Sequence, residues 1–290
     1  NRLLMTSATL GAASQGSDAD WRFKQLQSDV GAARDCVQFA RAFSPNRFGD
    51  LSVVLADPQT PKPVVSSDED STRLSRGFIA NTVSMIRAAA RSGPVLVLTG
   101  SFSEALKISN VLTYHHTLHE RGTSLAGAIN HFQTRRDILI TPSAWQGTSI
   151  RDENGKQIIG NLVITRIPFK PPQGSMEALF VRAKGERGPY AMAQSKARSI
   201  FQFQQYMQAV IKMRQGVGRL IRAPSDVGTL WIGDPRFPRE SSDRYGVLCG
   251  ALSQRFHHKL ENASVFNAHS GRAESQPNKT PESLKEFVLL

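Results

Sequence analysis

The sequence contains only two cysteines, Cys36 and Cys249, in 290 residues. Two cysteines are too few for an iron–sulfur cluster, and they need not form a disulfide. No apolar run approaches ~18 residues and no charged-then-apolar leader opens the chain, so we expect neither a membrane span nor a signal peptide. This cysteine usage favours a reducing compartment, and we expect a cytoplasmic protein.

Acidic residues are scarce relative to basic ones. The chain has 36 Lys and Arg against 24 Asp and Glu, which gives a formal net charge of +12. The excess is concentrated, because residues 151–222 hold 13 basic and 4 acidic side chains, a local charge of +9. Such a positive field favours polyanions, nucleic acid first, although a merely soluble basic face fits the same count.

Short apolar runs alternate with helical patterns along the chain. We expect buried strands at residues 3–10, 50–57, 95–99, 137–141, 162–169 and 229–233. We expect helices at residues 21–31, 73–91, 104–120 and 194–214. Strands separated by helices of this length predict an α/β fold, a mostly parallel sheet flanked by helices on both faces. Ligands of such folds bind beyond the carboxyl ends of the strands.

One domain is expected over residues 1–261. Within it, the pair Asn154-Gly155 predicts an inserted β-hairpin at about residues 151–161. From residue 262 to residue 290 the composition is polar and poor in large apolar groups. That composition predicts a flexible tail.

Residues 215–222 combine two glycines with two arginines, directly after a strongly helical run. Arg219 and Arg222 are three residues apart, so they can lie on one face of a helical turn. Guanidinium groups suit phosphate oxygens, and Gly216 and Gly218 would let a phosphate approach the backbone. This layout is typical of an arginine-finger segment, which neutralises charge on a transferring phosphoryl group. On these residues alone, a surface turn with solvated charges fits equally well.

Several other polar or aromatic residues invite a functional interpretation. His115, His116 and His119 lie within the helix expected at residues 104–120, and the last two have a spacing seen in metal sites. No carboxylate or third partner is placed nearby, so a solvated helix face is favoured and no metal site is predicted. Trp231 lies inside an expected strand and should be core, whereas Trp145 follows a strand end and is open to a binding role.

Six segments in a fixed order carry a resemblance to a known family. They are residues 6–10, 98–103, 143–150, 164–172, 215–222 and 233–236. Together they resemble the second RecA-like motor domain of superfamily 2 helicases of the DinG and XPD type, over roughly residues 1–255. The hairpin insertion resembles that of DinG-like helicases of type IV CRISPR systems.

The resemblance implies catalytic and nucleotide-binding roles. Arg219 and Arg222 would be arginine fingers that reach ATP bound to another motor domain, with Gln215 polar to the same phosphates. The glycines implied beside the nucleotide are Gly147, Gly216 and Gly218. The implied cofactors are ATP and Mg²⁺, held mainly by an N-terminal half, because this sequence has neither a phosphate-cradling Gly-Lys loop nor an acidic Mg²⁺-binding segment.

The resemblance also implies partners. Ser101 and Ser103 would hold a backbone phosphate of single-stranded DNA, and Thr9 and Trp145 would lie on the DNA-facing side. The other implied partners are the N-terminal RecA-like domain of the same protein and a CRISPR ribonucleoprotein complex. Movement in the 5′ to 3′ direction follows from the family analogy alone.

The expected function is therefore the C-terminal motor half of an ATP-dependent DNA helicase, inactive without its N-terminal half. The chain opens with Asn1 rather than Met, so we expect it to be cut from a longer polypeptide. The family usually shows Trp-Glu-Gly-x-Asp, and here Gln146 and Ser149 replace the two carboxylates. Those replacements keep an alternative open, a non-catalytic nucleic-acid-binding module with a helicase-derived fold.

Overall fold

The computed structural model describes residues 49–63, 74–169, 190–243, 245–252, 256–268 and 270–274, with only the backbone for 190–204. The strand expected at residues 3–10, the helix expected at 21–31 and the predicted site residue Thr9 lie outside these ranges. Among the described residues, no helix is long and apolar enough to cross a bilayer.

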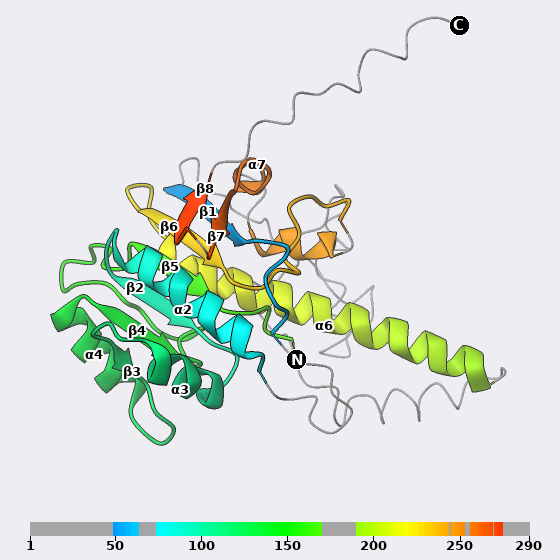
Figure 1. Cartoon of the computed structure of the whole chain (residues 1–290), viewed down its shortest axis with the longest axis horizontal. Coiled ribbons are helices and arrows are strands. Elements are labelled where there is room, and N and C mark those ends of the chain that lie inside the picture. Colours follow the sequence, from blue (N-terminus) through cyan, green and yellow to red (C-terminus); the bar gives the residue numbers. More distant parts are fainter. Residues whose placement is uncertain are drawn as a thin grey trace, which may run out of the picture.

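In this part of the chain, eight strands form one sheet in the order β3-β4-β2-β5-β6-β1-β7-β8 (Figure 1). The strands are β1 (Asp50–Ala56), β2 (Val95–Leu98), β3 (Thr117–Leu118), β4 (Ile138–Thr141), β5 (Asn161–Ile164), β6 (Val227–Ile232), β7 (Ser264–Asn267) and β8 (Arg272–Glu274). All paired neighbours are parallel except β7 and β8. The central strands β2, β4 and β5 are buried at every position, as expected where helices cover both faces.

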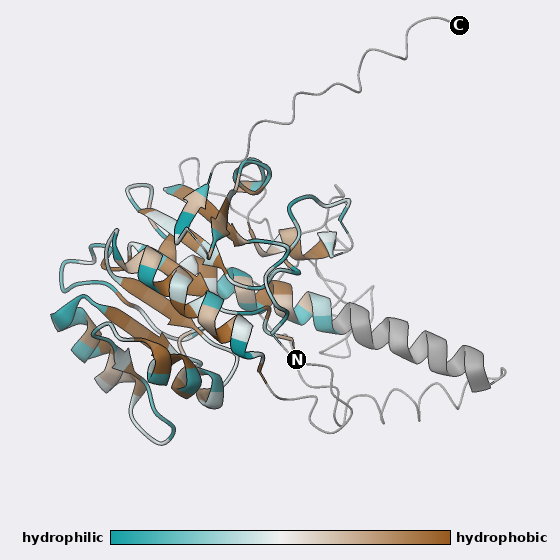
Figure 2. Ribbon diagram, viewed as in Figure 1, coloured by the Kyte–Doolittle hydropathy of each residue, from teal (hydrophilic) through white to brown (hydrophobic). Residues whose placement is uncertain are grey.

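Helices cover both faces of the sheet. They are α2 (Arg76–Ala90), α3 (Phe102–Val111), α4 (Leu125–Arg135), α6 (Tyr190–Leu220) and α7 (His257–Glu261), with the 3₁₀ helix η2 (Gly246–Ala251). Helices α2 and α3 share one apolar core with Val95 and Val97 of β2, and α4 and α6 share the other with Leu96 and Leu98. The alternation along β2 follows from the pleat of a strand. Figure 1 shows α2 in front of the sheet and α6 behind it, and Figure 2 shows the hydrophobic strands between them.

Serine caps set the starts of three helices. The side chains of Ser75, Ser101 and Ser124 each accept a hydrogen bond from the backbone N–H of the third following residue. Such caps satisfy donors that have no partner within the helix. The cap at Ser101 fixes where α3 begins after β2.

The strands expected at residues 50–57, 95–99, 137–141 and 229–233 and the helix expected at 73–91 are confirmed by β1, β2, β4, β6 and α2. The strand expected at 162–169 is shorter, since β5 ends at Ile164. The hairpin expected at about 151–161 is reduced to a single antiparallel bridge between Arg151 and Gln157.

The helix expected at residues 104–120 is wrong beyond Val111. The chain there becomes β3, and His119 N–H donates to the carbonyl of Ile140, so pairing with β4 overrides the helical pattern. The histidines therefore do not share a helix face. His119 is buried, with its two ring nitrogens near Thr141 Oγ1 (2.9 Å) and the Thr123 carbonyl (3.2 Å).

The flexible tail expected from residue 262 is wrong over its first part. Strand β7 pairs with β1 inside the sheet, and the Phe266 ring is fully buried with its centroid 6.2 Å from that of Trp231. A strand needs only about four residues, and the average composition of residues 262–290 is too polar to indicate one. Trp231 is core as predicted, and its indole N–H donates to Asn161 Oδ1 at 3.0 Å.

Candidate functional site

Strands β2 and β5 are neighbours, but the chain leaves them toward opposite faces of the sheet. After β2 it enters α3 on one face, and the helix before β6, α6, lies on the other. Parallel sheets bind ligands at such a switch point, beyond the carboxyl ends of the strands. A crevice of about 160 Å³ lies there, which we call the switch crevice. Its lining is Gly100, Arg166, Ile167, Pro168, Phe169, Gln208 and Lys212.

A buried carboxylate holds the two sides of this switch point together. Glu104, in the first turn of α3, is fully buried. Its Oε1 accepts from Thr165 Oγ1 (2.5 Å), and its Oε2 accepts from Gly100 N (3.0 Å) and Arg166 Nε (2.6 Å). A buried charge is tolerated only when paired and hydrogen-bonded, and three donors meet that need.

Gly100 is required by the position of Arg166. A Cβ atom at Gly100 would lie 2.4 to 2.8 Å from atoms of the guanidinium group, which would then have to shift. Sequence reasoning missed both Glu104 and Arg166 as site residues. Ser101 and Glu104 have capping-box spacing, which explains the glutamate locally and gives no hint of its partners 61 and 62 residues away.

The predicted DNA contacts Ser101 and Ser103 lie directly after Gly100 at the carboxyl end of β2. The Ser101 side chain caps α3 and accepts from Glu104 N at 3.2 Å, and its hydroxyl proton can still be donated. Ser103 is exposed. Their position agrees with a ligand beyond the strand ends, and their role stays a prediction.

Trp145 is only 2% exposed, which corrects the prediction that it contacts DNA. Its indole N–H donates to the carbonyl of Thr99 at 3.1 Å, and Lys212 Nζ lies 5.1 Å from the ring centroid. A base therefore finds no free face on this ring. The buried indole instead fills the space between the end of β2 and α6.

The three glycines predicted beside a nucleotide have different surroundings. Gly216 is buried in α6, and a Cβ there would lie 3.0 to 3.2 Å from Leu98 and the Trp145 ring, so its small size serves packing rather than phosphate approach. Gly147 (φ +76°) and Gly218 have no atom within 4 Å of a would-be Cβ. Gly147 and Gly218 therefore remain candidates for positions where a phosphate approaches the backbone.

Arg219 and Arg222 meet at one backbone carbonyl. Helix α6 continues to Leu220, so residues 215–220 are helical instead of following the helix. Arg219 donates from Nη1 to the Thr148 carbonyl and from Nη2 to that of Trp145 (3.4 Å). Arg222 donates from Nη2 to the same Thr148 carbonyl (3.1 Å) and from Nη1 to Ser149 Oγ (3.3 Å). The two guanidinium groups are therefore adjacent, as their spacing predicted, and we call them the arginine pair.

Within the described ranges, no carboxylate forms a side-chain ion pair with Arg219 or Arg222. Burial, and then the charge of Arg222, lower the pKa of Arg219; burial and then Arg151 lower that of Arg222, against the effect of Asp226. Burial opposes ionisation of Asp226, but hydrogen bonds from the backbone of Ala223 and Arg222 and from Arg151 lower its pKa overall. Three guanidinium groups thus share one carboxylate, and the surplus favours an anion.

Gln215 is half-buried and precedes Arg219 by four residues, which places the two on one face of α6. The short hairpin supports the same end of this helix. Gln157 donates from Nε2 to the Leu220 carbonyl (2.9 Å) and accepts from Val227 N (2.9 Å). The hairpin is therefore packed against the arginine segment.

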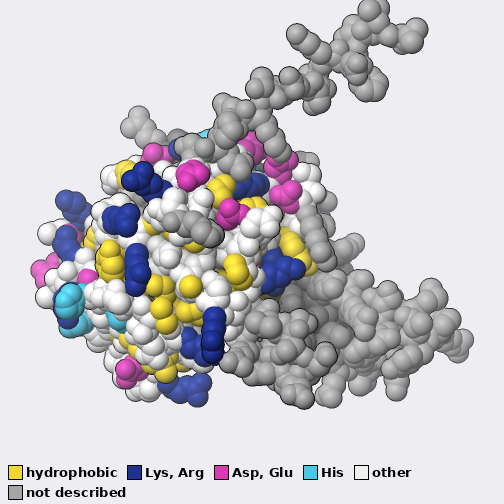
Figure 3. Space-filling view, in the orientation of Figure 1, with side chains coloured by type: hydrophobic (Ala, Val, Ile, Leu, Met, Phe, Trp, Pro, Cys, Tyr) yellow, Lys and Arg dark blue, Asp and Glu magenta, His cyan; other side chains and the backbone are white. Residues whose placement is uncertain are grey.

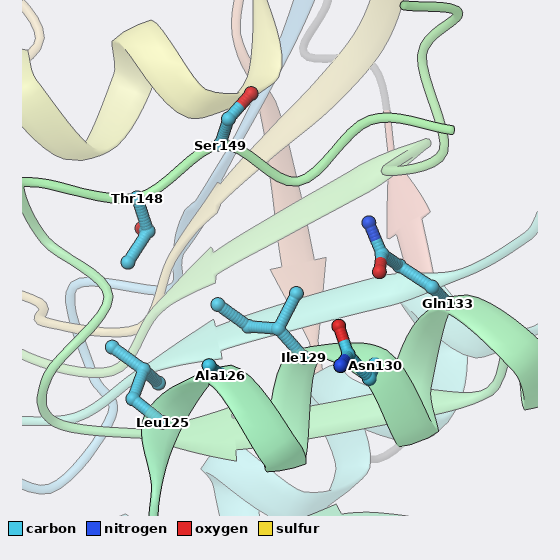
Figure 4. A pocket seen from close by; sticks show the side chains of 7 residues that line it. All are labelled: Leu125, Ala126, Ile129, Asn130, Gln133, Thr148 and Ser149. Carbon is cyan, nitrogen blue, oxygen red and sulfur yellow. The ribbon is translucent and has the colours of Figure 1, made fainter. Parts of the chain in front are cut away.

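A second hollow, of about 280 Å³, separates α4 from the loop that accepts the arginine pair (Figure 4). Its lining is Leu125, Ala126, Ile129, Asn130, Gln133, Thr148 and Ser149. Leu125 and Ile129 form an apolar side on α4. From the loop, the Thr148 side chain points toward them, whereas the Ser149 side chain points away from α4 (Figure 4). The loop is thus supported on one side by helix α6 and bordered by open space on the other.

A mostly parallel sheet with helices on both faces and a crevice at its switch point matches a RecA-like α/β domain. Residues 84–247 match the family described as helicase C-terminal domain. That match covers more than half of the chain, and the chain belongs to this family.

Relatives of the DinG and XPD type agree with the family. The chain is 25% identical over 250 residues to the 3′-5′ exonuclease DinG of Bacillus subtilis (strain 168), over 81% of this chain and 24% of that protein. A solved XPD helicase has a TM-score of 0.54 at 17% identity, over 83% of this chain and 37% of that one. An apo XPD structure has a TM-score of 0.50 at 15% identity, over 83% and 42%. The chain therefore spans about a quarter of the curated relative's length, and the two solved structures share its fold.

Proposed function

We propose that this chain is the C-terminal motor half of an ATP-dependent DNA helicase of the DinG and XPD type. Membership of the helicase C-terminal domain family supports the class. The observation that carries the motor role is the arginine pair, in which Arg219 and Arg222 converge on the Thr148 carbonyl.

The acceptors now used by the arginine pair suit a ligand that arrives and leaves. Both arginines donate mainly to neutral backbone carbonyls, and Arg219 Nε is buried without an acceptor among the described residues. Hydrogen bonds from guanidinium to a phosphate oxygen are stronger than those to a neutral carbonyl. These residues therefore fit the polyphosphate of ATP with its Mg²⁺, whose remaining contacts would come from an N-terminal motor domain. When bound, the nucleotide supplies the phosphoryl group that is transferred to water.

Within this mechanism, residues of this chain would stabilise charge on the nucleotide and transmit a movement to the end of β2. Arg219 and Arg222 would neutralise charge on the γ-phosphate, with Gln215 on the same helix face. Movement of Arg219 would act on the Trp145 carbonyl, whose indole is hydrogen-bonded to Thr99 at the end of β2. Single-stranded DNA would lie at that end, near Ser101 and Ser103. Movement from 5′ to 3′ is proposed by analogy with the family.

The test is the DNA-stimulated ATPase rate of the full-length protein carrying Arg219→Ala. Loss of an arginine finger is expected to lower the rate by ~10³–10⁵. The matched control is Arg272→Ala, an exposed arginine on the edge strand β8, which should leave the rate unchanged. An Arg219→Ala protein with wild-type ATPase and intact DNA binding would instead favour the non-catalytic nucleic-acid-binding module. The isolated chain is expected to have no ATPase activity.

A narrower proposal concerns the biological setting. We infer that the full-length protein acts in the cytoplasm with a CRISPR ribonucleoprotein complex, as DinG-like helicases of type IV systems do. The short hairpin closed by Arg151 and Gln157 supports this subgroup. Co-purification with the ribonucleoprotein would test it, and the absence of any complex at micromolar concentrations would contradict it.

A further inference from the structure

We propose that the short hairpin at residues 151–157 is a brace that positions Arg222 for its role in phosphoryl transfer. Its positioning residues are Arg151 and Gln157, which act together with Asp226, and we call these three the brace residues. The proposal rests on the proposed function, because Arg222 is the residue that the brace holds. The hairpin itself contains none of the residues that the family resemblance assigns to ATP or DNA.

Arg222 needs support from outside its helix. It lies beyond the end of α6 at Leu220, whereas Arg219 is part of that helix. In a continued helix, the backbone N–H of Arg222 would donate to the Gly218 carbonyl. Here the Gly218 carbonyl accepts from Arg222 Nε instead, at 2.8 Å, and the Arg222 N–H donates to Asp226. The backbone that carries this guanidinium is therefore fixed by the loop before β6.

Asp226 provides that support with a single carboxylate oxygen. Its Oδ2 accepts from Arg222 N and Ala223 N, both at 2.7 Å. The side chain is only 2% exposed, and a buried charge is costly unless it is paired. A negative charge beside the C-terminal end of a helix is also disfavoured by the helix dipole. Asp226 therefore needs a cation in order to hold these two amides, and Arg151 Nη2 donates to the same oxygen.

The hairpin fixes Arg151 before its side chain reaches Asp226. Arg151 Nη1 donates to the Gly155 carbonyl across the turn at 2.8 Å, and residues 151 and 157 form the antiparallel bridge. Gln133 of α4 donates from Nε2 to the Arg151 carbonyl at 2.7 Å, which ties the hairpin to that helix. A guanidinium that is already oriented loses little freedom in its ion pair. The hairpin can therefore hold Asp226 in one place.

Gln157 fixes both ends of the segment that carries Arg222. Its Nε2 donates to the carbonyl of Leu220, the last residue of α6, at 2.9 Å. Its Oε1 accepts from the N–H of Val227, the first residue of β6, also at 2.9 Å. Residues 221–226 thus run between two points that one side chain holds. A shift of the hairpin would move both points and displace the Arg222 backbone between them.

The charges of the brace differ from those spread over the outer surface. On the face shown in Figure 3, which carries α2, lysine and arginine side chains stand apart among neutral and apolar ones. Around Asp226, by contrast, the Arg151 side chain and the Arg222 backbone converge on one buried oxygen. Hydrogen bonds to a charged acceptor are about twice as strong as neutral ones, so this group can hold Arg222 in a defined position.

The experiment compares Arg151→Met with the wild type in the full-length protein. Methionine keeps a side chain of similar length and removes the charge and both hydrogen bonds. We expect faster amide hydrogen exchange at Arg222 and Ala223 without nucleotide or DNA, because Asp226 loses its cation. We also expect the maximal DNA-stimulated ATPase rate to fall by about 10²-fold, the loss that a misplacement of about 1 Å can cause. The affinity for single-stranded DNA should not change.

Double variants separate positioning from general destabilisation. In an Arg222→Ala background the brace has no guanidinium to position, so adding Arg151→Met should not lower the ATPase rate further, whereas independent effects would multiply. Arg151→Lys keeps a cation for Asp226 and should recover part of the rate. The matched control is Arg135→Met, because Arg135 of α4 pairs with Asp137 at 3.4 Å instead of with the loop before β6. It should change neither the amide exchange nor the rate.

The outcomes distinguish a failure of the brace from a failure of the motor proposal. Wild-type amide exchange at Arg222 and Ala223 in both Arg151→Met and Gln157→Leu would overturn the brace, and Gln157→Leu alone decides this if Arg151→Met does not fold. A further multiplicative loss of rate in the Arg222→Ala background would also overturn it. If Arg222→Ala lowers the rate and Arg151→Met does not, only the brace fails. If Arg222→Ala keeps the wild-type rate, the motor proposal fails and the brace fails with it.

Discussion

The molecule holds its two groups of cations in different ways. In the switch crevice, Arg166 is tied to the buried carboxylate of Glu104. In the arginine pair, Arg219 and Arg222 donate to the backbone carbonyls of residues 145, 148 and 218 and to one hydroxyl. A carboxylate fixes and partly neutralises a guanidinium, whereas a carbonyl positions it weakly and leaves its charge available.

The difference suggests two kinds of role. A fixed, partly neutralised cation suits a structural link between the ends of β2 and β5. A loosely held, unneutralised pair suits a charge that appears only in one step of a cycle. Trp145 touches both, through Lys212 on its ring and Arg219 on its carbonyl.

The largest expected effect comes from removing the carboxylate. Glu104→Ala leaves the donors of Thr165, Gly100 and Arg166 without their acceptor, and should lower the free energy of unfolding by ~3–5 kcal/mol. Chemical denaturation measures this, with the exposed Glu120→Ala as control. The double variant Glu104→Ala/Arg166→Ala should recover part of the loss, because no unpaired charge remains. No recovery would mean that the ion pair does not hold this switch point.

The second-largest expected effect concerns the arginine pair. Arg222→Ala removes one of the two guanidinium groups on the Thr148 carbonyl and should lower the DNA-stimulated ATPase rate by ~10²–10³. Affinity for single-stranded DNA should stay close to that of the wild type. A variant that loses DNA affinity and keeps its ATPase rate would reverse the assignment of the two regions.

Of the two groups of cations, the sequence predicted the one formed by near neighbours and missed the one formed by distant segments. The spacing of Arg219 and Arg222 predicted that they lie together, because helical geometry depends on neighbours alone. The Glu104 and Arg166 pair joins residues 62 apart, which only the parallel pairing of β2 and β5 brings together. Burial of Trp145 depends in the same way on α6. The sequence therefore predicted most strands and the arginine pair, and missed contacts between distant segments.

Two further predictions, the helix expected through residue 120 and the flexible tail expected from residue 262, failed because of pairing between distant strands. The segment from His115 to His119 continues a helical pattern in the sequence. Pairing of β3 with β4 stabilises it more than the continued helix would. Strand β7 is short and lies in a polar stretch of sequence. Its place in the sheet is evident only from its pairing with β1 in the structure. In both places tertiary pairing outweighs local propensity.

A pH-dependent effect isolates the carboxylate beside the arginine pair. The lowered pKa of Asp226 means that its ionised form stabilises the fold; this stability is present above the unfolded value near 3.8 and is lost as pH falls through the lower folded value. Asp226→Asn should therefore cost ~1–3 kcal/mol of unfolding free energy at pH 7. The gap to the wild type should narrow below pH ~4. Denaturation at pH 7 and pH 3 checks this, and a constant gap would contradict it.

The smallest effect tests whether the short hairpin supports the arginine side. Gly155 has φ +73°, and no atom lies within 4 Å of a would-be Cβ, so Gly155→Ala should cost only backbone strain of ~1–2 kcal/mol. Gly127→Ala is the matched control, since that glycine lies in α4 with room for a methyl group and should gain ~0.5–1 kcal/mol.

The hairpin also predicts where the Gly155→Ala strain is felt. Gln157 bonds the Leu220 carbonyl at the end of α6, so loosening the turn should disturb the arginine pair before the switch crevice. The expected signature is a lower maximal ATPase rate at unchanged affinity for single-stranded DNA. Gln157 is close to Arg166 along the chain but contacts the end of α6, so a loss of DNA affinity instead would place the hairpin on the crevice side.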